Sequence, residues 1–458
     1  MIFILISLLT LILSIILFKK AAGTLSLLKL NMISFVFYYP LLIESFIGVN
    51  IAILGLDNHY LLSRITDNST RLTTYFAVIY VMIALPLSMV IMSFIARFNA
   101  KREFYVYTKK PIQSIITKYD SAIYLSMCIL SIIAFASTLY TFITIGKIPL
   151  LDMIIGKDSN YLAQLRISVS RNFAGNVYIR NILMLGLTPI LSYIAFSYYK
   201  LYSNKKWKRM FVFLFITSIF AYTYNLAKAP VLWYIISFLF LNVLISGSIS
   251  RQLLISMGLL TISLIVAMYL LLGGATQIST LFSINTGPIG RILLGQITPL
   301  FYHFKIFPEM VPFLRGQSFP QSILSLFGME SIRSGRIVMS IVNPEGISSG
   351  TAGVMNTLFI GEAYANFGWL GVILGTIYVG FLIQLIYILF LRLPKNPLAL
   401  GLFTYFTLNI PSIVTGGFID FIYNAGFIMV VILVVCIFIL GQLFQGSVAN
   451  TKKSQGAV

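Results

Sequence analysis

Charged residues, cysteine and histidine are all scarce in this sequence. Only 10% of the 458 residues are charged, and there are two cysteines and two histidines. A disordered chain combines low hydrophobicity with high charge density, so this composition excludes disorder. Cys128 and Cys436 both lie within apolar runs, which excludes a disulfide framework and argues against a thiolate metal site. No spacing of histidines or carboxylates is typical of a metal-binding motif, so we predict no metal and no other cofactor.

Apolar residues, in contrast, make up 59% of the chain, far more than in a soluble globular protein. Crossing about 30 Å of hydrocarbon takes roughly 20 residues of helix. Eleven apolar stretches approach or exceed this length: 1–18, 31–56, 72–96, 121–145, 181–199, 210–225, 230–247, 252–273, 367–391, 397–414 and 425–446. We therefore predict an all-α, polytopic membrane bundle of about 11 spans, with a range of 10 to 13, that forms a single domain over residues 1–458.

The basic residues are distributed unequally between alternate loops. If the first span begins outside the cell, 19 of the 32 Lys and Arg residues fall in inside loops, at about three times the density found outside. This pattern predicts an extracytoplasmic N-terminus and a cytoplasmic C-terminus. The net charge of +20 then reflects topology and attraction to anionic lipid, so nucleic acid is not an expected partner. Most acidic residues fall on the outer side, which we predict to be the working face.

Two long outer loops interrupt the predicted spans. Residues 274–366 separate the eighth span from the ninth, and about 90 residues are too many for a passive connection. A second outer loop covers residues 146–180. Apolar pieces in these loops, at 148–155 and 294–301, are expected to form short amphipathic or re-entrant elements. No matching pair of broken spans appears in two halves of the chain, as it would in many transporters.

Arginines are retained in both outer loops although the topology rule disfavours them there. The guanidinium fork suits phosphate, so we expect two or three of these arginines to contact a ligand phosphate; snorkelling or pairing with loop carboxylates explains about half of the set. The seven outer arginines are Arg166, Arg171, Arg180, Arg291, Arg315, Arg333 and Arg336. Lys228 lies in a predicted hairpin of about four residues at the outer surface, and is either a further ligand contact or an interfacial anchor.

Two carboxylates fall in apolar surroundings. Glu44 lies near the middle of the second predicted span, where it is either a protonated structural donor or a group that faces a cavity. Glu362 and Asn366 are four residues apart, so a helix would place them on one face. A buried carboxylate there could take a proton from a sugar hydroxyl. The alternative is a helix-start carboxylate that hydrogen-bonds a neighbouring span.

The segment around Glu362 also resembles a known family. A Gly-rich outer loop that closes with GEAYANFG at 361–368, followed by a long span from Trp369, is similar to the oligosaccharide repeat-unit (O-antigen) polymerases of the Wzy type. The span number and the large late outer loop are also similar. The chain departs from the family in lacking an Arg-x10-Gly loop pattern, and in having Lys228 in a short outer turn where family members often have arginine.

The resemblance implies a GT-C-like membrane glycosyltransferase of the bacterial plasma (inner) membrane, with its active site on the extracytoplasmic side. Its donor and acceptor would be oligosaccharides carried by undecaprenyl diphosphate, and a chain-length regulator is a further candidate partner. Such a reaction needs positive charge to hold the leaving diphosphate and a base to activate the attacking hydroxyl.

We assign these roles to named residues. Glu362 is the leading catalytic base, Asp420 and Glu345 are reserve bases, and His303 helps to position a substrate. Tyr364 and Asn366 are the predicted sugar contacts. The predicted diphosphate contacts are Arg166, Arg171, Lys228, Arg291, Arg333 and Arg336.

Three other functions stay open at this point. A glycan ligase acting on a different acceptor would have nearly the same layout. A flippase or transporter would move the lipid-linked glycan without forming a bond, although the long outer loop and the lack of repeated halves count against it. A noncatalytic scaffold is disfavoured by the outer charged groups.

Overall fold

The computed structural model describes residues 1–114, 120–271, 283–285, 287–419, 426, 428–436 and 439. All regular elements of these residues are helices, as predicted. They divide into two compact units, each built from several chain segments. Unit 1 comprises Met1–Tyr107, Gly273–Arg392 and Thr407–Asn424, and unit 2 comprises Thr108–Leu272, Leu393–Phe406 and Ala425–Val458.

Helices long and apolar enough to cross a membrane coincide with eight of the eleven predicted spans. Within the described residues these stretches are Ile2–Lys29, Met32–Ile53, Asn68–Ile95, Ala122–Ile145, Ile179–Tyr202, Ala229–Ser246, Ile360–Arg392 and Pro397–Val414. The predicted spans 210–225 and 252–273 fall largely within helices α10 (Lys205–Thr223) and α12 (Arg251–Leu271), which are not among the eight. Half of 425–446 lies outside the described residues. The chain therefore has the helices of a polytopic membrane protein, while the count of 11 and the orientation stay predictions.

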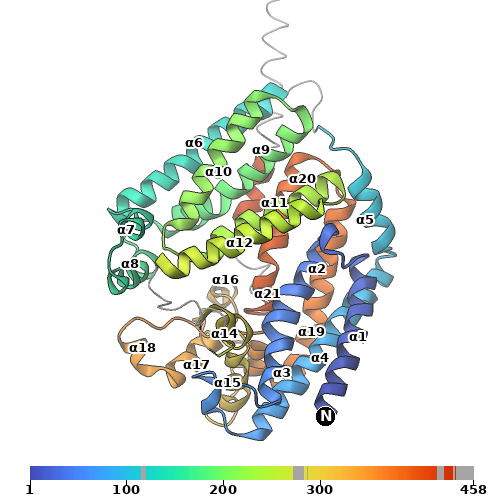
Figure 1. Ribbon diagram of the computed structural model, residues 1–458, viewed down its shortest axis with the longest axis vertical. Helices are drawn as coiled ribbons and strands as arrows, with labels where there is room; N and C mark the ends of the chain where they lie inside the picture. The colour runs from blue at the N-terminus through green and yellow to red at the C-terminus, as the bar shows by residue number, and fades with distance from the viewer. Residues whose placement is uncertain are drawn as a thin grey trace, which may run out of the picture. The chain divides into compact units, whose positions relative to one another are not determined.

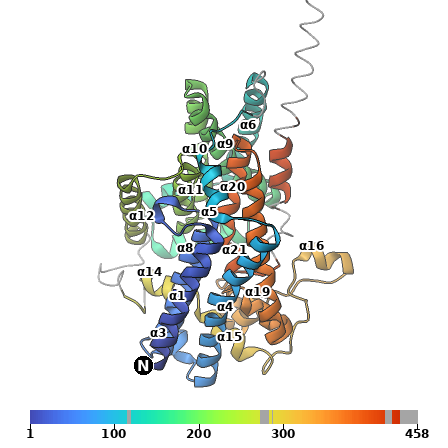
Figure 2. The same cartoon turned by 90° about the vertical axis from the view of Figure 1, so that its right-hand side faces the viewer.

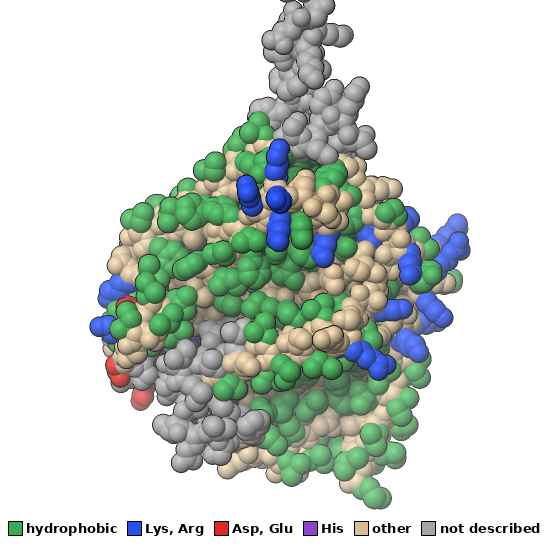
Figure 3. Space-filling model, turned by 45° about the horizontal axis from the view of Figure 1, so that its top comes forward, with side chains coloured by type: hydrophobic (Ala, Val, Ile, Leu, Met, Phe, Trp, Pro, Cys, Tyr) green, Lys and Arg blue, Asp and Glu red, His purple; other side chains and the backbone are tan. Residues whose placement is uncertain are grey.

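Helix α1 (Ile2–Ala22) has the burial pattern of a membrane helix. Its buried residues include Ser7, Thr10 and Ser14, whereas leucines and isoleucines along its length are exposed. A soluble helix would bury its apolar side chains, but in lipid the small polar residues favour the contacts between helices. Hydrophobic side chains also cover much of the molecular face drawn in Figure 3.

Three long helices form the frame of unit 1. Helix α4 (Asn68–Ile95) packs along both α1 and α19 (Ile360–Arg392), as Figures 1 and 2 show. Helix α4 begins where it does because the Asp67 carboxylate accepts hydrogen bonds from the backbone N–H groups of Ser69 and Thr70, at 3.0 and 2.9 Å. The second predicted span consists of α2 (Met32–Val36), the π-helix η2 (Phe37–Ile47) and α3 (Gly48–Ile53).

Short elements complete unit 1. They are η1 (Leu27–Lys29), η3 (Leu62–Arg64), α5 (Ala100–Lys109), α14 (Gly287–Leu293), α15 (Thr298–Ile306), α16 (Gln321–Leu324), η5 (Ser325–Phe327), α17 (Ser334–Val342), α18 (Pro344–Ser348) and α21 (Pro411–Val414). Six of them lie in the predicted loop 274–366, and about half of the described residues of this loop are helical. Helix α15 packs against α4 and α19 and is almost entirely buried, so the apolar piece 294–301 lies inside the unit.

Unit 2 is built around the hairpin of α9 (Thr188–Tyr202) and α10. Tyr198 stacks on Trp207 with ring centroids 4.2 Å apart, and both rings are buried. Asn204 begins α10 by accepting a hydrogen bond from Trp207 N at 3.0 Å. The other elements of this unit are α6 (Asp120–Ile145), α7 (Pro149–Ile154), α8 (Ser159–Arg171), the π-helix η4 (Ile179–Leu187), α11 (Lys228–Ser246), α12 and most of α20 (Pro397–Asn409).

Candidate functional site

A break in α19 determines where the candidate site lies. Phe367 and Gly368 have non-helical dihedral angles, and Gly368 has φ +59° and ψ −146°, a combination close to a region that only glycine adopts easily. The break separates a short N-terminal segment, Ile360–Asn366, from a long one that starts at Trp369. The long segment has 24 residues, enough to cross about 30 Å of hydrocarbon. Glu362 therefore lies on the short segment, before the predicted span begins at residue 367.

The loop 314–318 covers the break and reaches the Glu362 side chain. Leu314 N and Arg315 N donate hydrogen bonds to the carbonyl oxygens of Ala365 and Asn366, at 2.9 and 3.1 Å. These bonds satisfy carbonyl groups that lose helical partners at the break. Four residues further on, Ser318 Oγ donates to Glu362 Oε1 at 2.9 Å, and both residues are buried.

The predicted common face of Glu362 and Asn366 is confirmed. Asn366 Nδ2 donates to the Glu362 carbonyl oxygen at 2.8 Å and to Ser318 Oγ at 2.7 Å, while Asn366 Oδ1 accepts from Gly316 N at 2.9 Å. Asn366 is fully buried. This arrangement favours a role in holding Glu362 over direct contact with a sugar.

Arg333 forms an ion pair with Glu362. Its Nε lies 3.9 Å from Glu362 Oε1, and the two side chains are 33% and 7% exposed. Arg333 immediately precedes α17 and has an extended backbone conformation there. A guanidinium that is one-third exposed beside a nearly buried carboxylate can reach an anionic ligand.

His303 faces the same region from α15. Its Nδ1 lies 2.7 Å from the Pro299 carbonyl oxygen, which can only accept, so Nδ1 carries the proton. In the neutral ring Nε2 is then the acceptor, 3.3 Å from Ser334 Oγ. Burial lowers the pKa of His303 to about 4, which keeps the ring neutral at physiological pH. Glycine at 361 permits this close packing, because a Cβ there would lie 3.3 Å from His303 Cγ and 2.7 Å from Thr357 Cγ2.

Three predicted site residues line one small pocket of unit 1. Glu362, His303 and Arg333 surround it together with Ser334, Gly335, Met355, Asn356, Thr357, Gly416 and Gly417. The pocket is small: it has about 10 Å³ of room for the centre of a water molecule, and the empty space of about 230 Å³ around it includes open solvent. A carboxylate, a neutral imidazole and a guanidinium thus converge from three segments of the chain.

The remaining predicted residues of unit 1 lie elsewhere. Arg336 donates to the carbonyl oxygens of Ala352 and Gly353, at 3.3 and 3.2 Å. Tyr364 packs its ring against Phe304, Phe313 and Trp369. Arg291 on α14 and Glu345 on α18 are exposed and do not line the pocket. Asp420 lies outside the described residues, so its role as a reserve base stays a prediction.

The other predicted cations belong to unit 2. Arg166 and Arg171 are exposed on α8. Lys228 is the first residue of α11, which confirms the predicted short turn after α10, but its side chain lies outside the described part. Arg180 is buried, with its guanidinium over the rings of Phe173 and Tyr224. Arg180 is therefore one of the arginines that we expected to serve the structure and not to bind a ligand.

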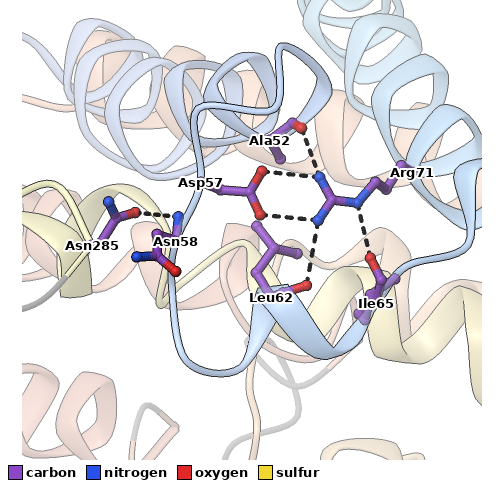
Figure 4. A network of polar contacts seen from close by, with 7 residues as sticks. All are labelled: Ala52, Asp57, Asn58, Leu62, Ile65, Arg71 and Asn285. Carbon is purple, nitrogen blue, oxygen red and sulfur yellow. Dashed lines mark hydrogen bonds and ion pairs between the residues drawn. The ribbon is translucent and has the colours of Figure 1, made fainter.

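Arg71 shows how a structural arginine differs from Arg333. Figure 4 shows its guanidinium bound to both oxygens of Asp57, at 2.9 and 3.0 Å, and to backbone carbonyl oxygens around it. Asn58 N donates to Asn285 Oδ1 at 2.7 Å, which ties the same loop to the segment before α14. Arg71 therefore holds the loop between α3 and α4.

Ser318 and Glu44 are buried residues that do not line the pocket. Ser318 was not predicted, because it lies 44 residues from Glu362 in sequence and no motif joins them. Glu44 is buried within η2, as expected for a carboxylate inside a span, and does not line the pocket.

Comparison of the chain with protein-family models finds no match, and searches of the curated proteins and of the solved structures find none either. The resemblance to Wzy-type polymerases stays an interpretation of the sequence.

Proposed function

We propose that the protein is a membrane glycosyltransferase that joins undecaprenyl-diphosphate-linked oligosaccharide repeat units into a surface polysaccharide, such as O-antigen, capsule or exopolysaccharide. The reaction takes place at the outer face of the bacterial plasma membrane. Both donor and acceptor are lipid-linked, and no nucleotide sugar is used.

The convergence of Glu362, Arg333 and His303 on one pocket carries this proposal. The sequence predicts these three residues to be the base, a diphosphate contact and a positioning group. Arg333 lies 3.9 Å from Glu362, so a donor diphosphate at Arg333 and an acceptor hydroxyl at Glu362 would lie side by side. The pocket adjoins the start of a 24-residue apolar segment, where a lipid-anchored substrate presents its diphosphate.

In the proposed reaction, the Glu362 carboxylate takes the proton of a hydroxyl on the non-reducing sugar of the acceptor. The hydroxyl oxygen bonds to the anomeric carbon of the donor glycan as the bond from that carbon to the diphosphate oxygen breaks. The undecaprenyl diphosphate leaves with its negative charge held by Arg333. A positioned base of this kind accounts for about 10²- to 10⁴-fold of the rate, and alignment of the two substrates for much of the rest.

An elongation assay tests the proposal. Purified protein in liposomes, supplied with lipid-diphosphate repeat units alone and with a chelator present, is expected to produce a ladder of longer glycans. Transfer of the glycan only onto an added acceptor of another class would establish a ligase. Movement of the lipid-linked glycan across the bilayer without any elongation would overturn the proposal in favour of a transporter.

A further inference from the structure

The hydrogen-bond chain behind Glu362 has a defined direction. Asn366 Oδ1 accepts from Gly316 N, and Asn366 Nδ2 donates to the carbonyl oxygen of Glu362. If the Asn366 amide were turned over, Nδ2 would face the Gly316 N–H, donor against donor, and Oδ1 would face the Glu362 carbonyl oxygen, acceptor against acceptor. The backbone groups therefore fix the orientation of the amide. Nδ2 therefore points its second hydrogen at Ser318 Oγ, 2.7 Å away.

This direction determines where the Ser318 hydrogen goes. A hydroxyl has one hydrogen to donate, and Oγ already accepts from Asn366. The hydrogen is therefore directed at Glu362 Oε1, 2.9 Å away. A proton on Oε1 would face this hydrogen, so the arrangement stabilises the ionised carboxylate in a site where burial alone would favour the neutral acid. Arg333 Nε, 3.9 Å from the same oxygen, acts in the same sense.

We infer that Ser318 is a positioning residue that keeps Glu362 ionised and commits Oε1 as an acceptor, so that the carboxylate is ready to take the proton of the attacking hydroxyl. The inference rests on the proposed function for what Glu362 does with that proton. The ionisation of Glu362 can be measured without any substrate.

Carbodiimide labelling measures it directly. Dicyclohexylcarbodiimide reacts with a protonated carboxyl: the proton moves to a nitrogen of the reagent, a carboxyl oxygen adds to its central carbon, and the adduct rearranges to a stable N-acylurea. The full-length protein is treated at pH 7, and labelling of the peptide that contains Glu362 is measured by mass spectrometry. The exposed Glu345 serves as an internal reference, and Glu362→Gln as the blank.

Ser318→Ala is expected to raise the labelling rate of Glu362 about tenfold or more, the effect of one lost hydrogen bond to a charged group. Ser318→Thr keeps the hydroxyl and should label like wild type. Asn366→Asp keeps Ser318 but cannot donate to it, so Glu362 should label faster there too. Ser331→Ala is the matched control, because Ser331 Oγ bonds Phe319 O within the same loop.

An unchanged labelling rate in Ser318→Ala, or an equal increase in Ser331→Ala, would overturn the inference. In the elongation assay Ser318→Ala should lower kcat by about tenfold or more at unchanged KM, and Ser318→Thr should recover it. If the labelling results hold while no form of the protein elongates glycan, the proposed function fails and the assignment of Ser318 as the group that keeps Glu362 ionised stands.

Discussion

Replacing Gly368 by alanine tests how the break in α19 positions the site. Gly368 has φ +59° and ψ −146°, and holding a non-glycine residue in such a conformation costs about 1 to 3 kcal/mol. A Cβ at this position would also lie 3.1 Å from Phe313 Cζ, so the ring must move. We expect Gly368→Ala to lower the unfolding free energy by about 2 to 3 kcal/mol. The variant should also slow glycan elongation, because the Ile360–Asn366 segment next to the break carries Glu362.

Two glycine variants serve as controls in the same unfolding measurement in detergent. Gly258 lies in α12 with no atom within 4 Å of a built Cβ, so Gly258→Ala should leave stability unchanged or raise it by up to about 1 kcal/mol. Gly350 has φ +70° with open space around it, so Gly350→Ala measures the cost of a positive φ without any new side-chain contact. A Gly368→Ala protein as stable as Gly258→Ala would refute the reasoning.

Three further predictions concern charged and titratable groups. Asp57→Asn should lower the unfolding free energy by about 3 to 5 kcal/mol, because Arg71 loses its carboxylate partner in a largely buried pair; a loss below about 1 kcal/mol would contradict the role given to the pair. Because burial lowers the pKa of His303 to about 4 from an ordinary value near 6.5, the stability it contributes is complete above pH 6.5 and falls by about 3 kcal/mol as the pH drops to 4 and below. His303→Gln should remove that part of the pH dependence in a pH series of unfolding curves, and identical slopes in both proteins would disprove it. Lys395→Met should cost about 3 kcal/mol or more in the same measurement, since the buried Nζ donates to the carbonyl oxygens of Thr108, Lys110 and Ile245 at 3.0, 2.7 and 3.2 Å; the exposed Lys110→Met variant is its control, and equal stability of the two would count against the assignment.

Features that depend on local sequence were predictable. The eight candidate span helices follow from apolar length alone, and the shared face of Glu362 and Asn366 follows from their spacing of four residues. The predicted start of the ninth span at 367 coincides with the break at Phe367 and Gly368. The short turn before Lys228 was predictable for the same reason, because two apolar runs leave few residues between them.

Features that depend on distant segments were not predictable. Ser318 reaches Glu362 only because the loop 314–318 pairs with the carbonyl groups freed at the break. Arg333 could not be separated from Arg336 by sequence, since both are arginines of one loop. The difference lies in their partners: Arg336 donates to carbonyl oxygens of the backbone, while Arg333 lies beside a buried carboxylate. The π-helix η2 around Glu44 likewise has no sequence signature that separates it from an α-helical span.

The most direct test of the central claim compares Glu362→Gln with Glu345→Gln in the elongation assay. Glutamine has the shape of glutamate and still accepts a hydrogen bond from Ser318, so the variant should fold, but it cannot take a proton. We predict that Glu362→Gln lowers the elongation rate by at least about 100-fold, while Glu345→Gln, altered at an exposed residue outside the pocket, elongates like wild type. Elongation by Glu362→Gln at the wild-type rate would contradict the account.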